Sequence, residues 1–269
     1  MQASHSTPRP TAPSTWASVP CADLPRFDLA SLRARWEPLH AGQPMPPPAS
    51  DALAQAWVSY HNGDFARAVA DAQALGEEGL GLVDQATAVY ANYVEPREAT
   101  RLSLLRQVAE RAGARAAAMP DDGQALYWHA YALGRHAQAV SVARALAQGL
   151  GSRLKASLER VIVLQPRHAD AHFALGAFHA EVIDKVGPLV GRMTYGVRAD
   201  TALALFARGL ELHPASAAGR MDYARALLAL EGDARLAEAT RLYEQAAAIA
   251  PQDARERLDV ELARLGLRD

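Results

Sequence analysis

A proline recurs after each long helical stretch in the second half of the chain, and this recurrence constrains the fold more than any other feature. The four prolines are Pro120, Pro166, Pro214 and Pro251. Each ends the helix before it, because proline restricts the preceding residue, and a polar residue soon afterwards can cap the next helix. From residue 51 onward, apolar residues recur three and four apart and β-branched runs are scarce. This is the helical period, so we expect an all-α chain.

The spacing of these prolines indicates repeated helical hairpins with insertions. They lie 46, 48 and 37 residues apart, longer than the roughly 34-residue period of a tetratricopeptide (TPR) unit. First-helix positions follow each proline and second-helix positions precede the next one, which places the extra residues inside the hairpins. Two looser hairpins precede Pro120, and an amphipathic helix follows Pro251. The sequence therefore predicts an α-α superhelix, a TPR-like solenoid of about five hairpins with inserts and a C-terminal capping helix.

Composition divides the chain near residue 50. Residues 1–49 are rich in Pro, Ser, Thr and Ala and end in a cluster of prolines that favours extended backbone. We expect residues 1–49 to form a flexible N-terminal tail and residues 50–269 to form the TPR-like helical repeat domain. A short amphipathic piece from Leu29 to Leu39 could dock on the body, with Trp16 and Trp36 as anchors.

Charge and cysteine content narrow the functional classes. The formal net charge is −2 over 269 residues. The chain therefore has no excess of positive charge that would attract nucleic-acid phosphates, and we expect no nucleic-acid partner. Cys21 is the single cysteine, which excludes an internal disulfide framework. No stretch reaches the roughly 18 apolar residues of a membrane span, and the first twenty residues lack the basic start and apolar core of an export signal. We expect a cytoplasmic protein without a transmembrane segment.

The histidines favour a structural role. His168, His172 and His179 fall on one side of a predicted helix, as metal ligands would. No cysteine or carboxylate completes a ligand set, so we expect buried, hydrogen-bonded histidines and predict no metal and no cofactor.

The glycines of Gly76–Gly81 lack the strand and lysine of a phosphate loop and indicate an interhelical turn. No serine lies in a nucleophile elbow, and we expect a protein that is not an enzyme.

Several motifs after residue 125 carry a family resemblance. They are Tyr127-Trp128-His129-Ala130, Leu164-Gln165-Pro166, Ala171-His172-Phe173-Ala174-Leu175-Gly176 and the inserted segment 182–198. Residues 126–251, roughly half of the chain, resemble the TPR-like domain of the regulator of microtubule dynamics family, including its bacterial relatives. The resemblance implies a helical scaffold without catalytic residues. Microtubule association and phospholipid binding, attributed to eukaryotic members, are not carried over.

First helices line the concave face of a TPR stack, so the repeat register predicts a ligand groove. Its expected residues are Tyr127, Tyr131, Arg135, Phe173, Glu181, Met221 and Arg225. Aromatic residues and methionine offer broad contact there, and Arg and Glu can orient a bound segment. The apolar members could equally be core between hairpins, and the sequence leaves both interpretations open.

The insert 182–198 mixes apolar residues with three glycines and one proline, so it cannot continue one straight helix. One interpretation is a structural elbow that packs Leu189, Val190 and Tyr195 onto neighbouring hairpins. The other is a flap over the groove that carries Lys185, Leu189, Arg192 and Tyr195.

The sequence thus predicts a non-catalytic scaffold that engages a protein segment, with a protein or peptide as the partner. The alternative is a carrier of an apolar small molecule such as a lipid. A long open groove with charged walls favours the protein segment, whereas a closed apolar tunnel favours the lipid.

Overall fold

The computed structural model describes residues 16–17, 19, 23–140 and 142–268. Every regular element in these ranges is a helix, as expected for an all-α chain. None of these helices is long and apolar enough to cross a membrane. Cys21 lies outside the described residues.

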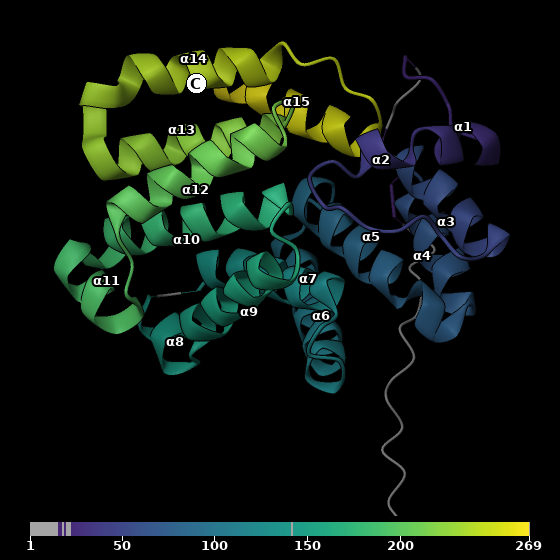
Figure 1. Ribbon diagram of the computed structural model, residues 1–269, viewed down its shortest axis with the longest axis horizontal. Helices are drawn as coiled ribbons and strands as arrows, with labels where there is room; N and C mark the ends of the chain where they lie inside the picture. The colour runs from purple at the N-terminus through teal and green to yellow at the C-terminus, as the bar shows by residue number, and fades with distance from the viewer. Residues whose placement is uncertain (1–15, 18, 20–22, 141, 269) are drawn as a thin grey trace, which may run out of the picture.

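Five helical hairpins stack side by side in chain order (Figure 1). They are α3 (Asp51–His61) with α4 (Phe65–Ala74), α5 (Leu80–Tyr93) with α6 (Glu98–Ala118), α7 (Gly123–Gln138) with α9 (Leu150–Leu164), α10 (Ala169–Val186) with α12 (Ala199–Leu212), and α13 (Ala217–Glu231) with α14 (Leu236–Ala247). The helix α15 (Ala254–Gly266) packs on α13 and α14. This confirms the predicted superhelix with its C-terminal capping helix.

The first helix of each later unit begins at a cap that follows the recurring proline. The side chains of Asp122, Ser216 and Asp253 accept a hydrogen bond from a backbone N–H in the first turn of α7, α13 and α15. At α10 the ring nitrogen of His168 takes this place and accepts from the Ala171 N–H at 3.1 Å. A proline that ends one helix and a polar residue that caps the next together set the repeat boundary.

The extra residues lie inside the hairpins, as the proline spacing predicts. The helix α8 (Val142–Ala147) lies between α7 and α9, and α11 (Pro188–Tyr195) lies between α10 and α12. Gly187, at φ +82°, turns the chain from α10 into α11, a conformation that side chains with a Cβ rarely adopt. Short 3₁₀ helices, η1 (Gly76–Gly79) and η2 (Gly232–Arg235), lie in the turns of other hairpins.

Residues 27–45 are part of the folded body, which corrects the expectation of a flexible tail through residue 49. The helices α1 (Leu29–Ala34) and α2 (Trp36–Leu39) place Leu32 and Trp36 in the core, at 0% and 4% exposure. Trp16 stacks on Tyr90 with 3.9 Å between ring centroids. Apolar residues at helical spacing outweigh the proline content here, so the predicted docking of this amphipathic piece and of its two tryptophans is confirmed.

The stack curves until its last helix meets its first. Figure 1 shows α15 beside α2 and α3, and α15 contacts α3 directly. The His61 ring bonds to Asp253 at 2.6 Å, and Arg35 donates to Gln252 at 2.6 Å. This closure holds the start of α15 against the first hairpin, and α15 then runs back along α13 and α14 (Figure 1).

Candidate functional site

The inner surface carries a groove between α7 and α10. Two hollows of about 120 Å³ and 90 Å³ adjoin there. Both are lined by Gly134, Leu154, Phe178 and Glu181, so the two hollows adjoin along these side chains. We call the pair the α7–α10 groove, with the larger hollow as its aromatic end and the smaller hollow as its apolar end.

The aromatic end joins ring surfaces to charged groups. Its aromatic lining comes from Tyr93, Tyr127, Tyr131, Phe173 and Phe178, and its charged lining from Arg135, Asp170, Glu181, Asp222 and Arg255. Burial raises the pKa of the Tyr131 hydroxyl, because the charged phenolate is disfavoured away from water. The tyrosines therefore stay neutral and offer hydroxyl groups and ring faces.

The apolar end lies beneath the insert. Its walls are Ala137, Val140, Ala145, Leu154, Phe178, Val182, Val186 and Tyr195, with Lys185 and Glu181 among the lining residues. Tyr195 from α11 meets the edge of Phe178 at 5.7 Å between ring centroids. A large apolar side chain fits these walls better than a charged one does.

Five of the seven residues predicted for the groove line its aromatic end, namely Tyr127, Tyr131, Arg135, Phe173 and Glu181. The two from α13 do not. Met221 is 1% exposed and packs in a core cluster with Ala246 and Val260, because α14 and α15 cover that side of α13. Arg225 is exposed and pairs with Asp222 at 3.0 Å.

Some of the five predicted residues that line the groove are buried in the core, and others are open to a ligand. Tyr127 and Phe173 are 3% and 4% exposed, so they form the floor of the depression and also part of the core. Tyr131, Arg135 and Glu181 are only partly buried. A ligand would therefore contact mainly these last three side chains.

Sequence reasoning missed Tyr93, Asp170 and Arg255, which also line the groove. Arg255 lies on the capping helix, and its side chain reaches Asp170 at 3.4 Å although 85 residues separate the two in sequence. The sequence pattern marks α15 only as an amphipathic cap, so nothing local indicates that its polar face turns inward.

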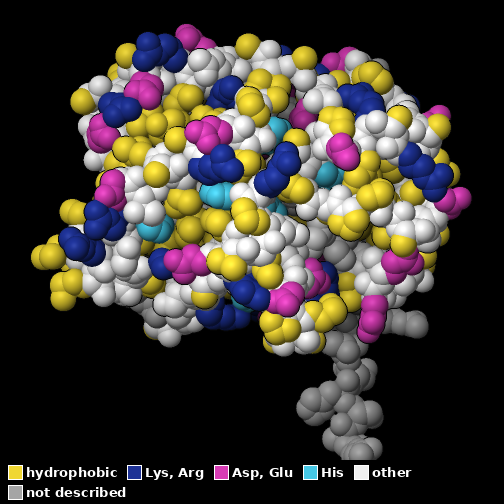
Figure 2. Space-filling view, in the orientation of Figure 1, with side chains coloured by type: hydrophobic (Ala, Val, Ile, Leu, Met, Phe, Trp, Pro, Cys, Tyr) yellow, Lys and Arg dark blue, Asp and Glu magenta, His cyan; other side chains and the backbone are white. Residues whose placement is uncertain are grey.

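The predicted flap residues divide between the groove and the solvent. Lys185 and Tyr195 line the apolar end, whereas Leu189 and Arg192 are exposed on α11. Leu189 and Val190 are 71% and 52% exposed, so the expectation that they pack onto neighbouring hairpins is wrong. Gly191 turns inward instead, where an added Cβ would lie 2.8 Å from Val197 Cγ2. Figure 2 shows hydrophobic side chains projecting at the left edge, where Figure 1 places α11.

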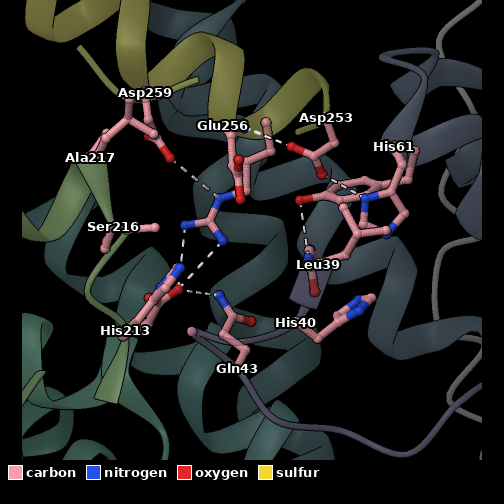
Figure 3. Close-up of a pocket in the computed structure, with 17 residues that line it drawn as sticks. Leu39, His40, Gln43, His61, His213, Ser216, Ala217, Asp253, Glu256 and Asp259 are labelled. Atoms are coloured by element: carbon pink, nitrogen blue, oxygen red, sulfur yellow. Dashed lines mark hydrogen bonds and ion pairs between the residues drawn. The ribbon is translucent and has the colours of Figure 1, made fainter. Parts of the chain in front are cut away.

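A second, polar cavity of about 40 Å³ lies where α3, α10, α13 and α15 meet (Figure 3). Gln43 donates to Asp170 at 2.8 Å, and the Asp170 N–H donates to the Gly42 carbonyl at 3.0 Å. Asp170 thereby ties the segment before α3 to the start of α10. Arg255 and Asp170 line both the polar cavity and the α7–α10 groove, so the two sites share a wall.

Four buried nitrogens and one buried oxygen around the polar cavity have no hydrogen-bond partner among the described residues. They are His40 Nε2, His61 Nε2, Gln85 Oε1, His213 Nδ1 and Arg255 Nε. A polar cavity of this size has room for water, which satisfies such groups in protein interiors. No group of three or more metal-ligating side chains occurs among the described residues. We interpret the cavity as a hydrated contact between the two ends of the stack.

The histidines predicted to be structural are buried and hydrogen-bonded to the backbone. His172 Nδ1 lies 2.9 Å from the His168 carbonyl, and His179 Nδ1 accepts from the Arg198 N–H at 3.2 Å. Their exposures are 6% and 4%. This confirms the prediction that they belong to the helical packing.

Comparison with known proteins supports the fold. No family model matches the chain, and no curated protein matches it. Among solved structures, the chain is similar to a thermophilic TPR protein of Thermus thermophilus, with a TM-score of 0.56 and 20% sequence identity. The match covers 80% of this chain and 98% of that one. The chain therefore has a TPR-like fold.

Proposed function

We propose that this chain is a non-catalytic scaffold that binds a segment of a partner protein in the α7–α10 groove. The observation that carries this proposal is that an aromatic hollow and an apolar hollow adjoin on the inner surface and share Gly134, Leu154, Phe178 and Glu181. Helical solenoids bind partners along concave surfaces of this kind. The aromatic end offers ring faces and hydroxyl groups, and the apolar end offers a place for a side chain.

The charged walls favour a protein segment over a lipid. Arg135, Asp170, Glu181, Asp222 and Arg255 line the aromatic end. A carrier of an apolar small molecule would instead need a closed and mostly apolar tunnel. Backbone amides and polar side chains of a protein segment can pair with these charged groups, whereas an acyl chain would leave them desolvated.

Two finer statements belong to the same proposal. Kinship with the regulator of microtubule dynamics family rests on the motifs between Leu126 and Pro251. A cytoplasmic setting is the other. Neither adds an activity on microtubules or on lipids.

A selection experiment tests the groove. A phage-displayed library of random dodecapeptides is selected on the immobilised full chain, and enriched peptides are synthesised for affinity measurement. Ala177, partly buried on α10, lines the aromatic end, so Ala177→Trp should fill it and weaken binding by about tenfold or more.

The matched control is Ala204→Trp, which places the same side chain on the exposed face of α12. It should bind like the unsubstituted chain, and thermal melts should show that both variants fold. Equal binding by the two folded variants, or a selection without any enriched peptide, would refute the groove as the binding site.

A further inference from the structure

Arg135 differs from the other cationic side chains of the α7–α10 groove. Lys185 pairs with Glu181 at 2.5 Å, and Arg255 pairs with Asp170 at 3.4 Å. Arg135 has no carboxylate within ion-pair distance among the described residues. Its guanidinium donates to the Gln138 side-chain oxygen at 3.3 Å and lies over the Tyr131 ring, 5.3 Å from the centroid.

The position of Arg135 favours a negatively charged ligand group. The guanidinium has five N–H donors, and its planar shape matches a carboxylate with two parallel hydrogen bonds. Tyr127, Tyr131 and Phe173 line the same hollow, and their rings reduce its exposure to water, which strengthens such a pair relative to one in open water. The neighbouring acids, Glu181 and Asp222, are already paired with Lys185 and Arg225.

The apolar end adjoins the aromatic end, which Arg135 lines, and the two share Leu154, Phe178 and Glu181. Gly134 lines both ends as well. A ligand carboxylate at Arg135 would therefore lie next to whatever fills the space between Leu154, Phe178 and Tyr195. That space suits a large apolar side chain.

We propose that the groove selects protein segments that carry a carboxylate beside a large apolar side chain, and that Arg135 binds the carboxylate. The carboxylate comes from an Asp or Glu side chain or from the C-terminus of the partner. This inference rests on the proposed function and names the chemistry of its ligand.

The test uses peptides recovered from the dodecapeptide selection described above, synthesised with a fluorescent label. Each is prepared in three forms: as selected, with its acidic residue changed to the amide, and with an amidated C-terminus. Affinities are measured by fluorescence anisotropy on the full chain, on Arg135→Gln and on Arg208→Gln. Arg208 is exposed on α12 and pairs with Glu211, away from the groove, so it is the matched control.

On the unsubstituted chain, neutralising the acid side chain or the C-terminus should weaken binding by about tenfold or more, the usual effect of losing a charge-assisted hydrogen bond. Whichever form loses affinity identifies the source of the carboxylate. On Arg135→Gln the same change should have little effect, and Arg208→Gln should behave like the unsubstituted chain.

Two results would overturn the inference while leaving the proposed function intact. One is a set of groove-binding peptides without any carboxylate dependence. The other is an equal loss on neutralisation in the unsubstituted chain and in Arg135→Gln. A selection that yields no binding peptide would overturn the proposed function and this inference together.

Discussion

Two carboxyl groups on α15 lie where burial disfavours their charge. Burial raises the pKa of Asp259 to about 6 and that of Glu256 to about 7, although Arg255 partly opposes both shifts. Tyr93 donates a hydrogen bond to Asp259. Asp170 and Asp253 lie in the same cluster, and their pKa values are lowered. The stability of the contact between the two ends of the stack should therefore depend on whether the carboxyl groups in the polar cavity are protonated.

The raised values predict that the contribution of these two carboxyls to stability falls as pH rises. Buried His40 and His168 act in the opposite direction, because burial lowers their pKa values to about 3 and about 4. A carboxyl whose folded-state pKa exceeds its unfolded value stabilises the fold while it is protonated, and this contribution is lost as pH increases through the folded pKa. For Asp259 and Glu256 the loss occurs between about pH 4 and 7. The difference in unfolding free energy between the unsubstituted chain and Asp259→Asn, measured in urea across this range, should therefore decline by about 1–3 kcal/mol.

This decline reflects Asp259, because the amide of Asp259→Asn does not titrate. Glu211→Gln, at an exposed position on α12, is the control and should keep the slope of the unsubstituted chain. A slope that is the same in both variants would mean that Asp259 does not titrate in the window assigned to it.

Much at this scale could be predicted from the sequence, because caps and core histidines depend on neighbours a few residues away. Asp122 and Ser216 cap the helices that follow them, and His172 bonds one turn back. Arg255 could not be placed, because its partner Asp170 is brought near only by the curvature of the whole stack. Met221 was misplaced for another reason, since the next two helices, α14 and α15, cover its side of α13.

At the scale of helices, the hairpins depend on small residues where two helices approach closely. A Cβ added at Gly176 on α10 would lie 3.0 Å from the Phe206 ring and 3.2 Å from the Ala202 carbonyl, both on α12. The proline spacing was enough to predict this contact, because it fixes which residues of the two helices face each other. The course of α11 was not predictable, since its glycines permit several turns.

Gly176→Leu should therefore overpack the hairpin of α10 and α12 and cost about 1–3 kcal/mol or more in unfolding free energy. The measurement is urea denaturation at constant pH. Ala207→Leu, at an exposed position on α12, is the matched control and should change stability little. Unchanged stability in Gly176→Leu would mean that α10 and α12 are not in the register described.

At the scale of the molecule, residues 27–45 and α15 close the stack on one side. Composition alone suggested a flexible tail, because prolines and small polar residues dominate its average. A few large residues decide otherwise: Trp36 forms an edge contact with Trp57 at 5.4 Å between centroids, and Phe27 is 7% exposed. The average composition of a segment cannot reveal an interface that so few of its side chains make.

Deleting residues 1–49 should consequently destabilise the chain by about 3–5 kcal/mol or more, because the loss of a buried tryptophan such as Trp36 alone costs about this much. Deleting residues 1–24 removes Trp16 and Val19 but keeps α1 and α2, so its cost should be smaller. Melting temperatures of the two truncated chains against the full chain make the comparison. Equal stability of all three would show that residues 27–45 contribute nothing to the core.

The contact between α15 and α3 also limits how this protein can change its length. Open solenoids gain or lose whole repeats during evolution, because each unit touches only its neighbours. Here an additional hairpin between α10 and α15 would carry Asp253 away from His61 and Arg255 away from Asp170. Duplication of a unit would leave buried charges without partners, so the number of hairpins is fixed by the geometry of closure.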